Sequence, residues 1–184
     1  MKKRLKYVIF KTKWGFFGLL ANQKGLLKSV LPHASYKTVK KYLLVGMFRG
    51  TKKDKELYPE LQKAIKAYYD SDNAEYADFT GRFFAPVCFE GSEFARKVLK
   101  TCMKIPLGRV WTYSQLAERA GFPNASRAVG TVLAKNQLPL IVPCHRVIRS
   151  DGKIGRFSAP GGTETKKKML EHEMRGYSCE NGNP

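Results

Sequence analysis

The stretch LPLIVPCHRVI, residues 138–148, carries the strongest structural signal in the chain, because an apolar run ends there in a proline, a cysteine and a histidine. The run is apolar enough to be buried as core. Successive residues of a strand point to opposite faces, so Cys144 and His145 can share a pocket only if the strand ends there or a water bridges them. Pro143 cannot donate to a strand ladder, which favours such an ending.

A cysteine beside a histidine has two interpretations. A thiol reacts as its thiolate, and a neighbouring imidazole is a common base for forming it. An isolated pair is more often a buried structural cysteine beside a core histidine, so a carboxylate that orients the imidazole would favour catalysis. Glu173 is the candidate, since it shares helical spacing with Lys166, Met169 and Leu170. The alternative is an exposed glutamate at a fraying helix end, and Glu171 would point elsewhere on the same helix.

Three helices are predicted upstream of this segment. The first runs from a cap at Ser92 to about Lys104. The second starts from a capping box at residues 112–115, and the third covers residues 125–135. The last two helices and their tight glycine-containing turn predict a helix-turn-helix, although many all-helical proteins contain such pairs.

The third of these helices has two different faces. Its core-facing positions are predicted to be Ala125, Ala128, Val129, Val132 and Asn136. The opposite face carries one long cation among small side chains, namely Arg127, Gly130, Thr131 and Ala134. Such a face suits a minor groove only about 6 Å wide, but contact with another helix explains it equally well. Gly130 costs roughly 1 kcal/mol relative to alanine inside a helix, which predicts a packing reason for it. Arg127 is either a surface cation or a probe inserted into the duplex.

The N-terminal half is predicted to be a small sheet with helices. Short apolar runs cut by turn-like segments across residues 5–31 indicate an antiparallel meander. Helices are expected around residues 38–47 and 58–69, and a strand near residues 82–89. The polar stretch at residues 70–78 is typical of a connection near a domain boundary.

Composition narrows the class of protein. The 184 residues, 43% of them hydrophobic, can bury a core of useful size. A formal net charge of +19 favours a polyanionic partner, although a solvated basic surface explains it too. The four cysteines lack the paired spacing of a metal cage and are too sparse for a disulfide framework, so a reducing compartment is expected. No apolar run is long enough for export or a membrane span, and we expect a soluble, cytoplasmic protein.

Six motifs occur in a specific order and spacing over about residues 92–174. They are Ile105-Pro106-Leu107-Gly108-Arg109-Val110, Thr112-Tyr113, Ser126-Arg127-Ala128-Val129-Gly130, Asn136, Pro143-Cys144-His145-Arg146-Val147 and Leu170-Glu171-His172-Glu173. This pattern resembles the O6-alkylguanine-DNA alkyltransferase family. The resemblance implies an α/β (α+β) fold in three parts. These are a small ribonuclease H-like domain with a short antiparallel sheet and helices (1–88), a mostly helical domain with a helix-turn-helix (89–176) and a disordered tail (177–184).

The resemblance also implies a DNA-repair methyltransferase that acts once. Cys144 would accept the methyl or alkyl group of O6-alkylguanine, and of O4-alkylthymine, after minor-groove binding and nucleotide flipping. His145 would take the thiol proton through a water, with Glu173 orienting its ring. Tyr113 would hydrogen-bond the flipped guanine and crowd the phosphate that helps turn it out, and Arg127 would fill the gap in the base stack.

The remaining implied contacts are with DNA and the lesion. The DNA-contacting residues would be Ser126, Arg127, Ala128, Gly130, Thr131 and Tyr113, and the lesion-binding residues Asn136, Val147, Phe157, Ser158 and Lys166. Asn136 would tie the helix at residues 125–135 to the segment at residues 138–148, which is called the reactive segment below. Lys166 would assist the leaving guanine. Ser158 would hold the lesion together with main-chain groups of Cys144 and Val147. No cofactor and no metal are implied, and the expected partner of the monomer is double-stranded DNA rather than a membrane.

The sequence departs from the family pattern at two places. Phe157 stands where many relatives carry tyrosine, and the loop at residues 158–162 is longer than in some relatives, which leaves the accepted alkyl size open.

Three other functions compete with alkyl transfer. A binding-only relative would lack the acceptor cysteine, which is present here as Cys144. A cysteine hydrolase needs a direct Cys–His pairing that adjacent residues do not supply. A helix-turn-helix regulator leaves the Cys144 segment unexplained.

Overall fold

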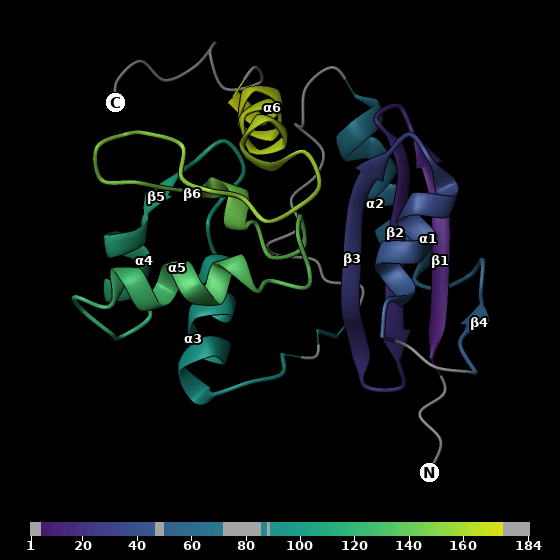
Figure 1. Cartoon of the computed structure of the whole chain (residues 1–184), viewed down its shortest axis with the longest axis horizontal. Helices are drawn as coiled ribbons and strands as arrows, with labels where there is room; N and C mark the ends of the chain where they lie inside the picture. The colour runs from purple at the N-terminus through teal and green to yellow at the C-terminus, as the bar shows by residue number, and fades with distance from the viewer. Residues whose placement is uncertain (1–4, 47–49, 72–85, 88, 175–184) are drawn as a thin grey trace.

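The computed structural model describes residues 5–46, 50–71, 86–87 and 89–174, and it places a sheet-rich N-terminal half beside a mostly helical C-terminal half (Figure 1). The mixed class with a small antiparallel sheet is confirmed. The expected tail, most of the connection at residues 70–78 and much of the strand near residues 82–89 lie outside the described residues. Within that strand, Val87 forms an isolated parallel bridge with Leu26.

The N-terminal half is built on a four-stranded sheet with the order β3-β2-β1-β4. Its strands are β1 (Lys6–Thr12), β2 (Gly15–Asn22), β3 (Gly25–His33) and β4 (Lys52–Lys53). The first three form the predicted antiparallel meander, whereas β4 pairs parallel to β1. Each hairpin turn leads into a glycine with positive φ, 125° at Gly15 and 136° at Gly25, which residues with a Cβ rarely adopt.

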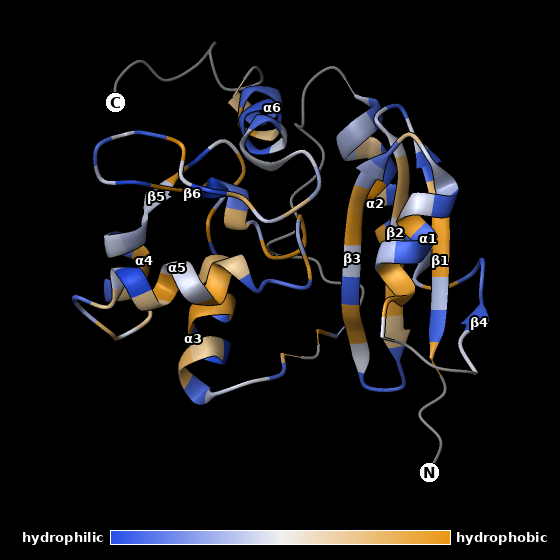
Figure 2. Ribbon diagram, viewed as in Figure 1, coloured by the Kyte–Doolittle hydropathy of each residue, from blue (hydrophilic) through white to orange (hydrophobic). Residues whose placement is uncertain are grey.

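Helices cover both faces of this sheet. The helix α1 (Tyr36–Leu44) packs on the face that carries Tyr7, Ile9, Leu20 and Val30. The helix α2 (Pro59–Asp70) packs on the opposite face, with Val8, Phe10, Phe17 and Leu19. Because both faces are buried, β1 and β2 contain the long hydrophobic stretches visible in Figure 2.

The ends of α1 and α2 follow their caps. Ser35 accepts a hydrogen bond from the Thr38 amide, so α1 begins two residues before the predicted start at residue 38. It ends at Leu44, because Gly46 takes the left-handed conformation with φ 73°; residue 47 of the predicted range lies outside the described residues. The helix α2 begins one residue after predicted, at Pro59, and proline suits the first turn of a helix.

The C-terminal half consists mainly of helices. Its elements are α3 (Glu93–Cys102), β5 (Trp111–Thr112), α4 (Tyr113–Arg119), α5 (Ser126–Ala134), the 3₁₀ helix η1 (Cys144–Arg146), β6 (Val147–Ile148) and α6 (Gly162–Met174). The three helices predicted upstream of the reactive segment are confirmed as α3, α4 and α5. The capping box is complete, because Thr112 and Gln115 each accept a hydrogen bond from the other's amide. The parallel pair of β5 and β6 was not predicted, since two-residue strands leave no periodic pattern.

The two halves meet along the outer edge of β3. The Ser29 amide donates to the Gln137 carbonyl at 2.9 Å, and the Ser29 hydroxyl donates to the Pro139 carbonyl at 2.8 Å. Further along the same strand, and within the N-terminal half, the Leu26 amide donates to the Pro86 carbonyl at 2.7 Å. One cluster of buried residues runs from the sheet through α2 into the C-terminal helices, so the domain division at residues 88 and 89 stays a prediction. Among the described residues, no helix has the length and apolar character needed to cross a bilayer.

Candidate active site

The apolar run before Cys144 is largely buried, as predicted, but it does not form a strand. The Val142 amide donates to the Leu138 carbonyl at 2.8 Å, and Leu140 has a φ of 75°, so the run folds into a tight turn. Cys144 and His145 then lie on the single 3₁₀ turn of η1. The alternation of side chains along a strand therefore does not separate them. Cys144 itself is only 6% exposed.

Asn136 joins the end of α5 to the reactive segment. Its Nδ2 donates to the Val142 carbonyl and to Cys144 Sγ, each at 3.0 Å. Burial raises the pKa of the Cys144 thiol, while the Asn136 donor and the charge of Lys166 act in the opposite direction. The thiol therefore needs a base, and two neighbouring groups stabilise the thiolate once it forms.

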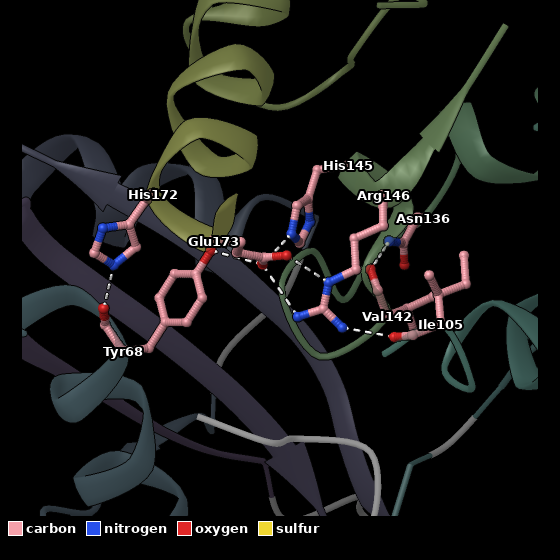
Figure 3. A network of polar contacts seen from close by, with 8 residues as sticks. All are labelled: Tyr68, Ile105, Asn136, Val142, His145, Arg146, His172 and Glu173. Atoms are coloured by element: carbon pink, nitrogen blue, oxygen red, sulfur yellow. Dashed lines mark hydrogen bonds and ion pairs between the residues drawn. The ribbon is translucent and has the colours of Figure 1, made fainter. Parts of the chain in front are cut away.

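Glu173 lies buried at the centre of an ionic network (Figure 3). Its Oε1 lies 2.7 Å from His145 Nε2 and 3.1 Å from Arg146 Nη2, and its Oε2 accepts from Arg146 Nε at 2.8 Å. The Tyr68 hydroxyl donates to the same Oε1 at 2.9 Å. Burial alone would raise the pKa of this carboxyl, but the hydrogen bonds from His145 and Arg146 and the charge of Arg146 outweigh burial and hold the pKa well below its usual range. The alternative of an exposed glutamate is therefore wrong.

The stripe on α6 that predicted this burial is confirmed. Lys166, Met169, Leu170 and Glu173 are all buried, whereas Glu171 is exposed on another side of the helix. The helical spacing placed a carboxylate among core positions, and the network accounts for its presence there, since buried charges are normally paired.

The two ring nitrogens of His145 differ in their hydrogen bonds within the described residues. A carboxylate accepts hydrogen bonds, so Nε2 carries the proton that Glu173 binds, and Nδ1 carries the lone pair. Nδ1 is buried and meets no hydrogen-bond partner among the described residues. Burial lowers the pKa of His145, although Glu173 opposes the shift. The result is a neutral imidazole at neutral pH, with the lone pair of a base.

Lys166 sits behind the reactive segment rather than in a cavity. Its Nζ donates to the Val147 carbonyl at 2.5 Å and lies 5.9 Å from the centre of the Tyr113 ring. Burial lowers the pKa of Lys166, and the thiol of Cys144 opposes this shift. Neither Lys166 nor Val147 lines the two cavities described next.

Cys144 lines two cavities. The larger, about 540 Å³, is also lined by Tyr113, Arg127, Gly130, Thr131, Leu133, Ala134, Arg156, Phe157 and Ser158. The smaller, about 330 Å³, lies towards β3 and α1 and includes Lys28, Ser29, Tyr42, Asn136 and Pro139. Phe157 and Ser158 line both cavities, so they stand at the boundary between the two approaches to the sulfur.

The residues predicted to contact DNA divide between the larger cavity and the surface. Arg127, Gly130 and Thr131 line that cavity, whereas Ser126 and Ala128 do not. Arg127 and Thr131 are exposed, and the Thr131 hydroxyl donates to the Arg127 carbonyl at 3.2 Å. The face of α5 that carries the long cation and the small residues therefore opens towards Cys144.

Two details of α5 correct the expectations. Ala128 is exposed rather than core-facing, and Leu133 is buried instead, because the apolar face is rotated from the assumed one. A Cβ added at Gly130 would meet the Tyr113 ring at 3.8 Å, an ordinary contact, so packing does not require this glycine. The tight contact is at Gly155, where a Cβ would come within 2.9 Å of the Tyr113 hydroxyl.

Sequence reasoning missed two members of the network. Arg146 is 1% exposed and donates from Nη1 to the Ile105 carbonyl at 2.7 Å, in addition to its ion pair with Glu173. A cation next to a buried apolar run was the signal that could have found it, since arginine is rarely fully buried unless paired. Tyr68 is 105 positions from Glu173 and gave no local signal.

Known proteins match both parts of the chain. Residues 93–175 match the model of the 6-O-methylguanine DNA methyltransferase DNA-binding domain. The methylated-DNA–protein-cysteine methyltransferase of Rattus norvegicus is 46% identical over 86 residues, 46% of this chain and 41% of that relative, so this match spans less than half of the rat protein. The protein of the same name from Cricetulus griseus is 31% identical over 176 residues, 92% of this chain and 82% of that relative.

Solved structures match the fold over nearly its whole length. Mycobacterium tuberculosis OGT, crystallised in complex with DNA, has a TM-score of 0.69 at 26% identity and covers 92% of this chain and 93% of its own. O6-methylguanine-DNA methyltransferase from Pyrococcus kodakaraensis has a TM-score of 0.63 at 26% identity and covers 92% of this chain and 98% of its own. With a relative that is similar from the sheet to the last helix, the chain belongs to the methylated-DNA–protein-cysteine methyltransferase family.

Proposed function

We propose that this protein repairs DNA by moving the methyl or alkyl group of O6-alkylguanine, and of O4-alkylthymine, irreversibly to Cys144. The observation that carries the proposal is a cysteine at a cavity lined by Tyr113 and Arg127, backed by the buried pair of His145 and Glu173. The names of the relatives and the DNA complex of the M. tuberculosis protein support the same reaction class.

DNA binding is assigned to α4 and α5, acting as a helix-turn-helix within a C-terminal domain over residues 89–176. The small side chains of Gly130, Thr131 and Ala134 let α5 approach a minor groove closely, and Arg127 reaches into the space that an extruded nucleotide leaves. The N-terminal domain, residues 1–88, is proposed to be ribonuclease H-like, which agrees with the strand order β3-β2-β1-β4. The partner is double-stranded DNA that contains the lesion.

The thiol is activated by the neutral imidazole. Cys144 gives its proton through a bridging water to Nδ1 of His145, the nitrogen without a protein partner. Glu173 holds Nε2 and stabilises the imidazolium that forms, in the way an orienting carboxylate serves a nucleophile–histidine pair. Asn136 and the charge of Lys166 stabilise the thiolate.

The transfer exchanges one bond for another. The sulfur attacks the alkyl carbon as the carbon–O6 bond breaks, and the departing guanine takes up a proton because its anion leaves poorly. Tyr113, whose pKa is raised by burial, is protonated before the transfer, and its hydroxyl supplies this proton to the guanine as the carbon–O6 bond breaks; the nearby Lys166 ammonium stabilises the phenolate that forms. The product is a thioether, which lacks the carbonyl that lets an acyl-cysteine hydrolyse, so each molecule acts once.

The lesion pocket is assigned to Phe157 and Ser158. Both residues line both cavities beside Cys144, so they decide which groups reach the sulfur. Phe157 has no hydroxyl to offer a lesion where many relatives have tyrosine, and Ser158 is the polar group that remains. The Val147 carbonyl accepts from Lys166 and Val147 lines neither cavity, so a contact of this carbonyl with the lesion stays a prediction.

Incubation with duplex DNA that contains O6-methylguanine is expected to add one methyl mass to the protein and no more. The mass should lie on the peptide that contains Cys144, because among the described residues this is the only cysteine that lines either of the two cavities. Intact-mass measurement before and after incubation, followed by peptide mapping, tests it, with unmethylated duplex as the control. An unmodified Cys144 after prolonged exposure to the lesion would refute the proposal.

Replacing Arg127 by alanine is expected to slow reaction with a duplex lesion more than reaction with free O6-benzylguanine. Only the duplex requires extrusion of a nucleotide, which costs a few kcal/mol, and a side chain that fills the gap offsets part of this cost. We expect a loss of about tenfold or more on duplex and little change on the free base, measured as single-turnover rates. Lys135→Ala removes another exposed cation next to α5, outside both cavities, and should change neither rate much. Equal losses on the two substrates would argue against the role of Arg127.

A further inference from the structure

Tyr68 reaches the active-site network from the other half of the protein. It lies on α2, beneath the sheet, and its hydroxyl donates to Glu173 Oε1 at 2.9 Å (Figure 3). The same oxygen accepts from His145 Nε2 at 2.7 Å. One carboxylate oxygen thus joins the base of the reaction to a phenol from the N-terminal half.

The position of this phenol is held by a second contact with α6. The Tyr68 carbonyl accepts a hydrogen bond from His172 Nε2 at 2.6 Å, and the two rings pack edge to face with centres 5.2 Å apart. His172 is the neighbour of Glu173 in the chain, so α2 binds two successive residues at the end of α6. Tyr68 is fully buried, and the hydroxyl is therefore held against Oε1 without competition from solvent.

We propose that Tyr68 is a positioning residue that acts through Glu173: it takes up part of the charge on Oε1 and so sets how strongly this carboxylate holds the protonated form of His145. The inference rests on the proposed function, because it assigns Tyr68 to the activation of Cys144. It makes the N-terminal half a contributor to the reactive site through the hydrogen bond to Glu173.

The charged groups around the imidazole determine the direction of the expected effect. His145 is faced by Glu173 and Lys166 from α6, by Arg146 and Cys144 from η1, and by Tyr68 from α2 through Glu173. Arg146 already binds both carboxylate oxygens, so the plane of the carboxylate survives loss of the phenol. What changes is the charge on Oε1. Without the phenolic donor the carboxylate attracts the imidazolium more strongly, which raises the pKa of His145.

The adjacent residue supplies a matched control. Tyr69 is 1% exposed, and its hydroxyl meets no hydrogen-bond partner among the described residues. Tyr68→Phe and Tyr69→Phe each delete one buried hydroxyl from the same turn of α2, but only the first removes a hydrogen bond to Glu173. A difference between the two variants therefore reports the hydrogen bond rather than the loss of an oxygen atom in the core.

The test is the pH profile of the single-turnover rate with methylated duplex, measured for the full-length wild type and both variants. Tyr68→Phe is expected to have the acid limb of its profile displaced to higher pH, with a rate about tenfold lower on that limb, because His145 is protonated at higher pH than in wild type. Tyr69→Phe should follow the wild type. Matching profiles for the two variants would overturn the inference, and so would uniform slowing of Tyr68→Phe without displacement of the acid limb, which marks a structural role.

Two further measurements keep the outcome decisive. Alkylation of Cys144 by iodoacetamide, followed by peptide mass, gives the same pH profile without DNA. If wild type fails to accept the methyl group from DNA, the proposed function fails, and the iodoacetamide profiles still decide the role of Tyr68.

If Tyr68→Phe does not fold, 3-fluorotyrosine placed at position 68 is the second variant. Its more acidic phenol is a stronger donor and should displace the acid limb to lower pH, whereas an unchanged limb overturns the inference.

Discussion

A protein in which Cys144 is replaced by alanine is expected to gain no methyl mass from lesion-containing duplex, however long the incubation. In the proposed reaction this sulfur forms the new bond, and no other cysteine among the described residues lines either cavity. Duplex binding should stay within about twofold of wild type, because the exposed face of α5 lies outside the substitution and phosphate contacts dominate affinity. Intact mass and fluorescence anisotropy at one fixed salt concentration measure the two properties.

A second buried free thiol, Cys102, provides the matched control. Cys102 lies on α3, is fully buried and lines neither cavity, and burial raises its pKa well above the usual value. Cys102→Ala should accept the methyl group as wild type does, at a temperature where both proteins are folded. A methyl gain in Cys144→Ala equal to that of wild type would remove Cys144 from the mechanism, and with it the proposed function.

The second large effect is expected from Glu173→Gln. The amide keeps the size of the carboxylate but not its charge, which leaves the guanidinium of Arg146 buried without a counterion. Breaking a buried ion pair from one side costs about 3–5 kcal/mol. We expect the free energy of unfolding to fall by that amount and the transfer rate to fall steeply, because the amide cannot supply the negative charge that stabilises the imidazolium of His145. Denaturant unfolding measures the free energy of unfolding, provided that its dependence on denaturant concentration is the same in both proteins.

The neighbouring glutamate separates this effect from a general change in α6. Glu171 is exposed and lies 4.0 Å from Lys167, so Glu171→Gln should change stability by no more than about 0.5 kcal/mol. Replacing the buried pair together, as Arg146→Met with Glu173→Leu, should recover much of the stability and none of the transfer rate. Equal stability of the two single glutamine variants would contradict the charge argument.

The pH dependence of stability has a definite sign for the same carboxylate. The folded-state pKa of Glu173 lies below its unfolded value of about 4.3, so its stabilisation is fully present above that pH. As pH falls through the unfolded and then the folded value, the folded state must take up a proton and the stabilisation is lost. Acid unfolding should therefore be less steep in Glu173→Gln than in wild type.

Short sequence patterns predicted most of the helices and strands. The glycine turns marked the meander, the Thr112–Gln115 capping box marked the start of α4, and the stripe on α6 placed Glu173 in the core. Each of these signals is contained within a few residues, where backbone sterics, caps and helical periodicity act. The rotation of the α5 face was missed because a nine-residue helix has room for two plausible apolar stripes, and packing against the rest of the protein selects one.

The rest of the site depended on contacts that no local pattern contains. Tyr68 meets Glu173 across 105 positions, and Arg146 meets the Ile105 carbonyl across 41. A sequence shows that a buried charge needs a partner, but not which residue of a distant helix supplies it. The fold of residues 138–142 was hidden for a related reason, since apolar content indicates burial and does not distinguish a strand from a tight turn.

The contacts at β3 have a consequence for the behaviour of the protein in concentrated solution. An outermost strand offers unpaired amide and carbonyl groups to any other extended chain, which is a route to aggregation. Pro86 and the segment from Gln137 to Pro139 occupy positions on that rim, and the opposite rim is β4, only two residues long and made of lysines. The segment that leads to Cys144 thus also covers part of the edge of β3 and keeps it from pairing with another chain. Separation of the two halves would leave β3 as a template for intermolecular pairing.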